Sequence, residues 1–419
     1  MTDSPAKTAV ARPDRATFLL SGALISLVLT QRLALPLGAF QLPVAVPAVF
    51  LFIVWGLMRG DLLIGRTRLW LYGVAIGSLL FASLVAGQRN DGVLTSIAYL
   101  CCLFSILVVT KPSGDVTQLF AVHQKLILVF AVVGFAQFTV QLVGLPFVDP
   151  ITRLPEQLQL AGYNTTQPLY FGARFIKPNA MVFLEASLLS KSLAIALLIE
   201  LFYFRRLTYL TAYCLCYACT FSGTGAITLA VGVLTGFRLI DRRTLVAFGL
   251  VSLLAVLALG ASKYGEVWTN RAAEFGKNNS SARTRFIEPY TRIVEVFQRD
   301  LPFFGHGAGS VEEGFTQRGG VDAFDPTAIK LTYEYGLFPA CLFMIFLLYC
   351  IYSSSAPLAL KHANTVVLIF LSGGLLEAAT LYYVFLLSGV IVAPAVVASR
   401  TLPARRPHEV GSSIELATE

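Results

Sequence analysis

Charged residues are scarce in this chain of 419 residues. They make up only 13% of it, against roughly 25% in an ordinary soluble domain, whereas 56% of the residues are hydrophobic. This balance excludes a soluble globular protein and indicates that lipid is the solvent. Apolar runs of about 20 residues recur along almost the whole chain, enough to cross a hydrocarbon core as helices.

Cysteines in a metal-binding arrangement are also lacking. All seven cysteines lie in apolar runs, and none has a histidine or an acidic cluster beside it. We therefore interpret them as packing residues. The first apolar run, from Thr17 to Thr30, follows a basic tail but lacks a convincing cleavage site, so we interpret it as a retained span and not as a signal peptide.

The apolar runs predict an all-α integral membrane fold with about twelve transmembrane helices. They lie near residues 17–35, 42–58, 68–87, 92–110, 122–145, 181–203, 207–221, 223–238, 244–261, 329–352, 364–381 and 382–399. The segment 207–238 is either two spans or one re-entrant segment. Residues 1–16 are expected to form an N-terminal tail, residues 17–399 the membrane domain and residues 400–419 a C-terminal tail.

The short loops differ in charge between the two sides of the predicted membrane domain. One side holds Arg59, Arg66, Arg68, Lys111, Lys125, Arg205, Arg206, Arg238, Arg242, Arg243 and Lys361, and the C-terminal tail adds Arg400, Arg405 and Arg406. The other side holds only Arg32 and Arg89 in its short loops. By the positive-inside rule the first side is cytoplasmic and carries both termini.

Two long outer loops, 146–180 and 262–328, are rich in positive charge. The second loop connects the ninth and tenth predicted spans. The positive-inside rule applies weakly to long loops, so these charges can lie outside and need another explanation. We therefore expect the working surface of the protein in these two loops.

The first outer loop leads into the sixth predicted span through Arg174, Lys177 and Glu185. We expect Glu185 one or two turns inside the span, where a charge costs about 2.5–3.5 kcal/mol on insertion scales. It therefore indicates a function or a buried partner; the alternative is an interfacial acid that pairs with a nearby cation. We interpret Lys191, on another face of the helix, as a snorkelling or hydrogen-bonded lysine.

The second outer loop contains a predicted amphipathic helix. Its apolar residues Tyr290, Val294 and Phe297 recur at helical spacing, and Pro289 suits its first turn. Glu288 precedes Arg292 by four residues, so surface pairing is a sufficient explanation for that arginine.

Arg283 and Arg285, just before this helix, have weaker local partners. Guanidinium groups bind phosphate oxygens in pairs and keep their charge, so these two are the preferred ligands for a pyrophosphate. His306 is the one histidine on the predicted outer face, where it could take part in chemistry or be solvated. Asp325 could serve as a base or cap the helix that follows, and the glycines around His306 suit a turn or a phosphate cradle.

Four segments between residues 170 and 350 stand in a distinctive order. They are Lys177-Pro-Asn-Ala-Met-Val-Phe-Leu-Glu185-Ala-Ser187, Ser222-Gly-Thr-Gly225, the stretch from Arg283 or Arg285 through Pro302-Phe-Phe-Gly305-His-Gly307-Ala-Gly309, and Glu334-Tyr-Gly336-Leu337. Together they resemble the motifs of the O-antigen ligase and polymerase superfamily, which are integral-membrane glycosyltransferases of the GT-C type.

The resemblance implies a bacterial inner-membrane enzyme with its site on the periplasmic face. Its donor would be a glycan linked to polyprenyl pyrophosphate, transferred with inversion and without a metal, a nucleotide sugar or another cofactor. Membrane lipids, a chain-length regulator and a flippase are the implied partners, and nucleic acid is not among them. The implied pyrophosphate ligands are Arg283, Arg285, Arg174, Lys177 and Arg292, and the implied base is Asp325, with His306 or Glu185 as alternatives.

Two departures from the family pattern bear on the reaction. Ligases of the family carry a histidine where this chain has Asp325, and the proline that follows the family's glutamate is Ala186 here. A segment with this glutamate is typical of exopolysaccharide polymerases, so we predict a polymerase that joins repeat units. The alternative is an O-antigen ligase that transfers the glycan to lipid A core. A transporter or flippase is a third interpretation, but it would place charges inside several spans.

Overall fold

The structure is a computed structural model, and it describes residues 14–38, 40–86, 93–112, 115–169, 173–260, 283, 287–299, 303–311, 326–371 and 375–392. This part of the chain is mostly helical. The helices are α1 (Arg15–Thr30), α2 (Ala45–Met58), α3 (Arg66–Ala86), α4 (Val93–Ser105), α5 (Val116–Leu142), α6 (Ala186–Ile199), α7 (Leu207–Thr220), α8 (Gly223–Gly236), α9 (Arg242–Gly260), α12 (Glu288–Arg299), α14 (Thr327–Tyr335), α15 (Leu337–Tyr352), α16 (Leu358–Thr365) and α17 (Ala378–Ser388).

Short strands and irregular helical turns complete the described elements. The strands are β1 (Ala34–Leu37), β2 (Phe40–Pro43), β3 (Leu63–Ile64), β4 (Val109–Pro112) and β5 (Ile391–Val392). The 3-10 segments are η1 (Ile106–Val108), η2 (Pro150–Arg153), η3 (Glu156–Leu158) and η5 (Phe237–Leu239). Two π-helical segments, η4 (Glu200–Phe204) and η7 (Val366–Leu371), continue α6 and α16.

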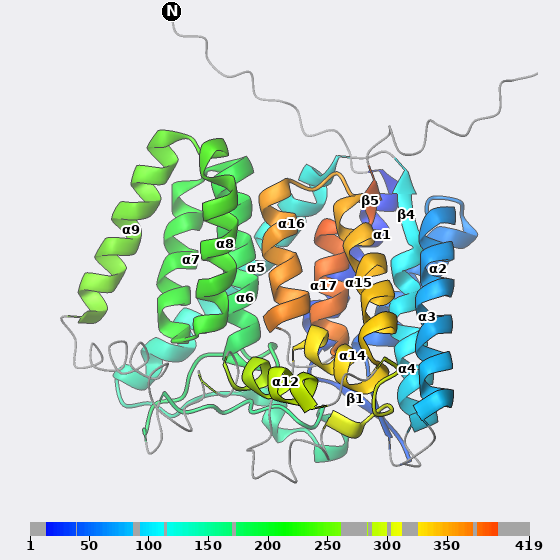
Figure 1. Cartoon of the computed structure of the whole chain (residues 1–419). Helices are drawn as coiled ribbons and strands as arrows, with labels where there is room; N and C mark the ends of the chain where they lie inside the picture. The colour runs from blue at the N-terminus through cyan, green and yellow to red at the C-terminus, as the bar shows by residue number, and fades with distance from the viewer. Residues whose placement is uncertain are drawn as a thin grey trace, which may run out of the picture.

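Most of the helices run side by side between two ends of one bundle (Figure 1). One end holds the first and last described residues, Asp14 and Val392, and we call it the terminus end. There Nζ of Lys111 lies 2.7 Å from Oδ2 of Asp14, and the strands pair in the order β3-β4-β5. The opposite end, the loop end, holds the hairpin β1–β2, residues 143–169 and 173–185, α12, α14 and residues 303–311.

The length and the apolar composition of the helices are those of a helical membrane protein. Within the described ranges, three helical segments are long and apolar enough to cross a membrane, namely α3, α5 and Ala186–Phe204, which is α6 continued by η4. Shorter apolar helices of 10–17 residues, among them α1, α2, α15 and α17, pack beside them.

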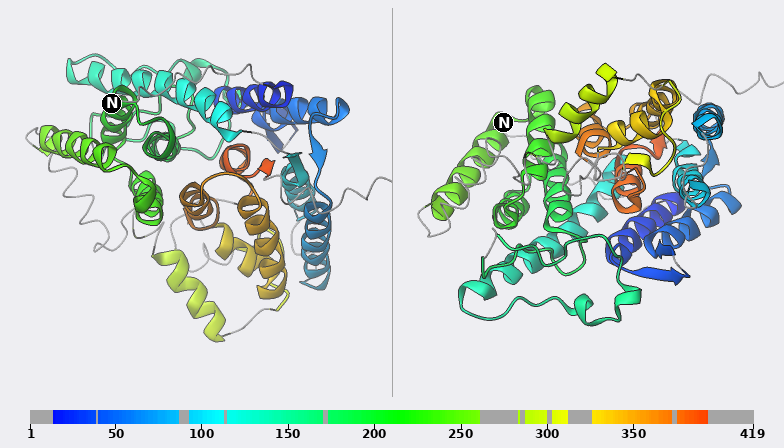
Figure 2. Two further views of the ribbon diagram at one scale, coloured as in Figure 1. Left: turned by 90° about the horizontal axis from the view of Figure 1, so that it is seen from above. Right: turned by 60° about the horizontal axis from the view of Figure 1, so that its bottom comes forward.

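Helix α6 lies at the centre of the bundle, and all of its residues are buried. It packs against α5, α7 and α8. Gly232 of α8 permits a close approach, because a Cβ there would lie 2.3 Å from Cδ1 of Leu198. In contrast, α9 packs chiefly on α7 and stands at the edge (Figure 2). The segment that leads into α6 therefore reaches the middle of the loop end.

The prediction of one continuous span at residues 329–352 is wrong, because these residues form two helices, α14 and α15. The helix breaks at Gly336, whose φ is 87°. A Cβ at Gly336 would lie 2.2 Å from the backbone oxygen of Phe303, so a second chain segment packs against the break. Only α15 runs along the bundle as the predicted span should.

The predicted positions of the last two spans also lie too close to the C-terminus. In place of 364–381 and 382–399, the structure has a helical segment from Leu358 to Leu371 and the helix α17. Pro357 precedes the first segment, where its missing N–H costs no helical hydrogen bond. Residues 393–399 lie outside the described part.

Residues 207–238 form a helical hairpin. Its arms α7 and α8 run in opposite directions (Figure 1). They join at Phe221 and Ser222, and Phe221 has a φ of 48°, which ends the first helix.

Candidate functional site

Glu185 stands at the start of α6, so the expectation that it lies one or two turns inside a helix is wrong. It is the N-cap residue, and Ala180 and Met181 before it have positive φ, which excludes a helix there. Its buried side chain accepts hydrogen bonds from the N–H of Asn164 at 3.2 Å and from Oγ of Ser187 at 3.0 Å. Within the described residues, its partners are neutral donors and not a cation.

A buried polar network fastens the first outer loop to α1 and α5. Nη1 of Arg32 donates to both carboxylate oxygens of Asp149 at 2.8 Å, and Nδ2 of Asn179 donates to Oδ2 of Asp149 at 3.0 Å. Oε1 of Gln137 accepts from the N–H of Asn179 at 3.0 Å. Sequence reasoning missed this network. Its one local signal is the pair Gln137 and Gln141, four residues apart in an otherwise apolar helix.

The Ser222-Gly-Thr-Gly225 turn packs directly on the first turns of α6. Oγ1 of Thr224 lies 2.9 Å from Oγ of Ser222 and 3.4 Å from Oγ of Ser190. A Cβ at Gly225 would lie 2.6 Å from the backbone oxygen of Ser190, so only glycine permits this contact. Oγ1 of Thr224 also lies 3.5 Å from the backbone oxygen of Ser187, so two of the segments that carry the resemblance touch each other.

The other two segments also touch. His306 lies over the end of α14, where its ring stacks on Tyr333 with centroids 4.4 Å apart and its Nδ1 is 3.2 Å from the backbone oxygen of Tyr333. Gly305 has a φ of 71°, and a Cβ there would lie 2.4 Å from the backbone oxygen of Glu334. Close packing therefore accounts for Gly305, and His306 is held by a protein contact that leaves Nε2 for other partners.

Helix α12 is amphipathic as predicted, with Pro289 in its first turn. Its buried face differs by one residue from the expected one. Ile293 is buried and packs with Tyr290 and Phe297, whereas Val294 is 52% exposed. Tyr290 also reaches η7, and its hydroxyl donates to the backbone oxygen of Phe370 at 3.4 Å.

Two candidate arginines share one carboxylate on α12. The pair of Arg292 with Glu288, predicted from their spacing, is confirmed with an Nη2–Oε2 distance of 3.7 Å. Nε of Arg283 lies 3.9 Å from Oε1 of the same glutamate. This glutamate offsets part of the positive charge that the two arginines bring to the loop end.

The remaining candidates divide between described and undescribed parts of the chain. Arg174 is exposed in the first outer loop, and Lys177 is buried in the same loop. Arg285 and Asp325 lie outside the described residues, so their predicted roles rest on the sequence.

A cavity of about 180 Å³ lies at the loop end, between the hairpin β1–β2 and the start of α17. Its walls are Gln31, Gln41, Pro43, Ala45, Tyr99, Leu160, Ala161, Tyr163, Leu184, Leu376, Ala378 and Ala379. We call it the outer cavity. Burial raises the pKa of Tyr163, and the carboxylates of Glu377 and Glu185 raise it further, so two acids lie near one wall of this cavity.

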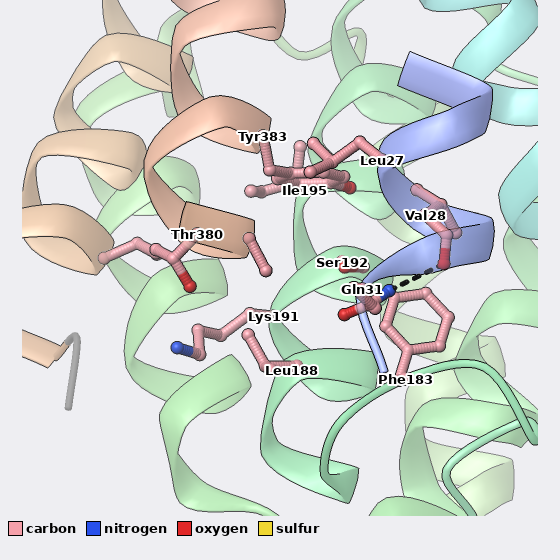
Figure 3. A pocket seen from close by; sticks show the side chains of 12 residues that line it. Leu27, Val28, Gln31, Phe183, Leu188, Lys191, Ser192, Ile195, Thr380 and Tyr383 are labelled. Atoms are coloured by element: carbon pink, nitrogen blue, oxygen red, sulfur yellow. Dashed lines mark hydrogen bonds between the residues drawn. The ribbon is translucent and has the colours of Figure 1, made fainter. Parts of the chain in front are cut away.

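A second cavity, of about 20 Å³, adjoins the outer cavity, because Gln31 and Ala379 line both. We call it the inner cavity. Figure 3 shows Lys191 of α6 and Thr380 of α17 among its walls. In the described part of the chain, the buried amino group of Lys191 forms no ion pair or hydrogen bond, and Oγ1 of Thr380 has no partner. The expected snorkelling or hydrogen bonding of Lys191 is not seen.

The described ranges contain no group of three or more histidine, cysteine, aspartate or glutamate side chains that could hold a metal ion. All seven cysteines are free thiols and no disulfide joins them. Comparison of the chain with protein-family models, with curated proteins and with solved structures gave no match.

Proposed function

We propose that the chain crosses a bacterial inner membrane about twelve times, with the terminus end in the cytoplasm and the loop end in the periplasm. Basic residues of the short connections support this orientation. Arg59 ends α2, Arg205 ends η4 and Arg242 starts α9, all at the terminus end (Figure 1). The short connections at the terminus end thus carry the positive charge that the positive-inside rule expects on the cytoplasmic side.

At the loop end, the proposed activity is polymerisation of a lipid-linked glycan. The observation that carries this proposal is spatial. The segments that resemble the ligase and polymerase superfamily form two contacting pairs, Thr224 with Ser187 and Gly307 with Glu334, and both pairs lie at the end that holds the basic loops. Segments more than 100 residues apart along the chain therefore gather on one surface.

The proposed reaction joins two repeat units. A base takes the proton from a hydroxyl of the acceptor sugar, whose oxygen attacks the anomeric carbon of the donor glycan. The new glycosidic bond forms as the bond to the pyrophosphate oxygen breaks, and polyprenyl pyrophosphate leaves with the electron pair. Attack opposite the leaving group inverts the anomeric configuration.

The side chains have distinct proposed roles. Arg283, Arg285 and Arg174 neutralise the charge that develops on the pyrophosphate, with support from Lys177 and Arg292. Asp325 is the proposed base. Glu185 is an alternative base, because each of its oxygens accepts one hydrogen bond and retains capacity for another.

Polymer length in cells tests this function. In cells that lack the chromosomal gene, a plasmid copy of the wild type should restore long chains, whereas Arg285→Ala or Asp325→Ala should leave mainly single repeat units. Arg283→Ala should shorten the chains less, because Glu288 already offsets part of its charge. Gel profiles of the extracted polysaccharide measure the chain length, with protein amounts checked by immunoblot.

Arg238→Ala at the terminus end is the matched control, because it removes an arginine far from the loop end and should keep long chains. Wild-type chain lengths in both Arg285→Ala and Asp325→Ala would contradict the proposed site. If full-length polymer accumulates on the lipid carrier when the gene is deleted, the activity is ligation and not polymerisation.

A further inference from the structure

We infer that the outer cavity binds one sugar ring of the acceptor repeat unit. This inference rests on the proposed function, since it assigns a site to the acceptor of that reaction. The donor pyrophosphate is assigned to the arginines of the outer loops, so the cavity would separate acceptor recognition from donor recognition.

The volume of the outer cavity suits a ligand larger than water. A cavity of about 10–15 Å³ on this measure holds one water molecule. The inner cavity, about 20 Å³, therefore holds about one water, whereas the outer cavity, about 180 Å³, has room for a group of many atoms. Its lining is about half polar, so an alkyl chain is a poor match for it.

The lining has the mixed chemistry that a sugar ring presents. A sugar ring has apolar C–H faces and a rim of hydroxyl groups. Tyr99 and Tyr163 offer aromatic surface with a polar tip, and Gln31 and Gln41 offer amides that both donate and accept hydrogen bonds. A few placed polar groups among aromatic and apolar walls are typical of small-molecule sites.

Polar atoms around the cavity lack protein partners. The buried hydroxyl of Tyr99 has no hydrogen-bond partner in the described part of the structure. Nε2 of Gln31 donates to the backbone oxygen of Val28 at 3.0 Å, and its Oε1 accepts no hydrogen bond from the described residues. Oε1 of Gln41 accepts from the N–H of Ala161 at 2.9 Å, which leaves its amino group for a ligand. Buried polar atoms are nearly always bonded, so the hydroxyl of Tyr99 needs water or a ligand.

The position of the cavity fits an acceptor. Its walls include Leu160, Ala161 and Tyr163 of the first outer loop and Leu376, Ala378 and Ala379 at the loop end, so it lies at the same end of the bundle as α12. Glu185 follows the wall residue Leu184, and Glu377 lies between the wall residues Leu376 and Ala378, so carboxylates that can accept a proton or hydrogen bond from a sugar hydroxyl are close.

Two substitutions test the site in different ways. Ala161→Leu fills the cavity from an exposed loop position and keeps the N–H that Gln41 accepts from. Tyr99→Phe removes only the hydroxyl without a partner, so a purely structural role predicts unchanged or higher stability. Tyr217→Phe is the matched control, because its buried hydroxyl also has no partner in the described residues but does not line the cavity.

Binding is measured on purified protein in detergent, with the methyl glycosides of glucose, galactose, mannose and N-acetylglucosamine as probes. We expect at least one glycoside to raise the unfolding temperature of the wild type and of Tyr217→Phe. The shift should vanish in Ala161→Leu and weaken at least several-fold in Tyr99→Phe. In cells, Ala161→Leu should reduce long chains at least tenfold at an unchanged protein amount.

The outcomes separate the inference from the proposed function. If no glycoside shifts the wild type, or if the shift persists in Ala161→Leu, the cavity is a water site and the inference is overturned, whatever the arginine variants do. If glycosides bind as expected but deletion of the gene leaves polymer length unchanged, the proposed function fails, and the assignment of the cavity to an acceptor fails with it.

Discussion

At the terminus end, the guanidinium of Arg68 donates to the backbone oxygens of Leu107, Val109, Cys350 and Gly389 at 2.7–3.3 Å, and Oγ of Ser353 accepts at 2.8 Å. At the loop end, the buried guanidinium of Arg32 is satisfied only in part, because Nη1 bonds to Asp149 and Nη2 does not. Nη2 of Arg32, the hydroxyl of Tyr99 and Oγ1 of Thr380 have no partner in the described residues.

This difference separates a stabilising end from an end suited to binding. An unsatisfied buried polar group costs about 1–3 kcal/mol, so a chain under selection for stability alone would not keep several of them together. Tyr99 lines the outer cavity and Thr380 lines the inner cavity, where a ligand or water could supply the missing bonds. Buried polar groups without a protein partner are expected at functional sites, where local rules of stability are broken.

The largest expected effect is at the terminus end. Arg68→Met leaves four buried carbonyl groups and one hydroxyl without their donor, so we expect a loss of about 5 kcal/mol in the free energy of unfolding. Unfolding of the purified variant in detergent measures the loss. Arg68→Lys should lose less, since an ammonium keeps the charge but has fewer donors. If Arg68→Met unfolds like the wild type, the terminus end is not the more stable one.

A smaller loss is expected from the buried ion pair at the loop end. Arg32→Met leaves the carboxylate of Asp149 buried without its cation, at a cost of about 3 kcal/mol. The double variant Arg32→Met/Asp149→Asn removes both charges and keeps one of the two N–H bonds that the Asp149 oxygens accept from Asn179 and Ile151, so it should recover about half of that loss. Unfolding of both single variants and the double variant gives the coupling. Strictly additive losses would show that the pair is not an energetic unit.

The local parts of the fold could be predicted from the sequence. The apolar run at 68–87 matches α3 within two residues, because helix length and apolar composition are local properties. The prediction failed where a distant segment decides the backbone. Gly336 breaks a helix because Phe303 packs on it, and Ala180 and Met181 turn before Glu185 because Asn179 bonds to Gln137.

The candidate site could be predicted only in part for the same reason. The pairing of Arg292 with Glu288 follows from a spacing of four residues. The outer cavity instead joins residues from Gln31 to Ala379, and nothing in their local sequence predicts that they meet. The unsatisfied hydroxyl of Tyr99 becomes visible only when its surroundings are known.

The smallest expected effect is a pH dependence at the terminus end. Partial burial alone would raise the pKa of Asp14, but hydrogen bonds from Lys111 and Thr17 outweigh it and hold the pKa below its usual value. A carboxyl group with a lowered pKa adds stability above its unfolded pKa, and this stability is lost as the pH falls through the folded value. The effect should stay below about 1 kcal/mol, because the Asp14 side chain is 58% exposed and salt screens the pair. Asp14→Asn keeps the helix cap, so its unfolding temperature should approach that of the wild type between pH 5 and pH 3, since only the wild type loses this contribution there. An equal decline in both proteins would show that Asp14 and Lys111 add nothing to the stability of this end.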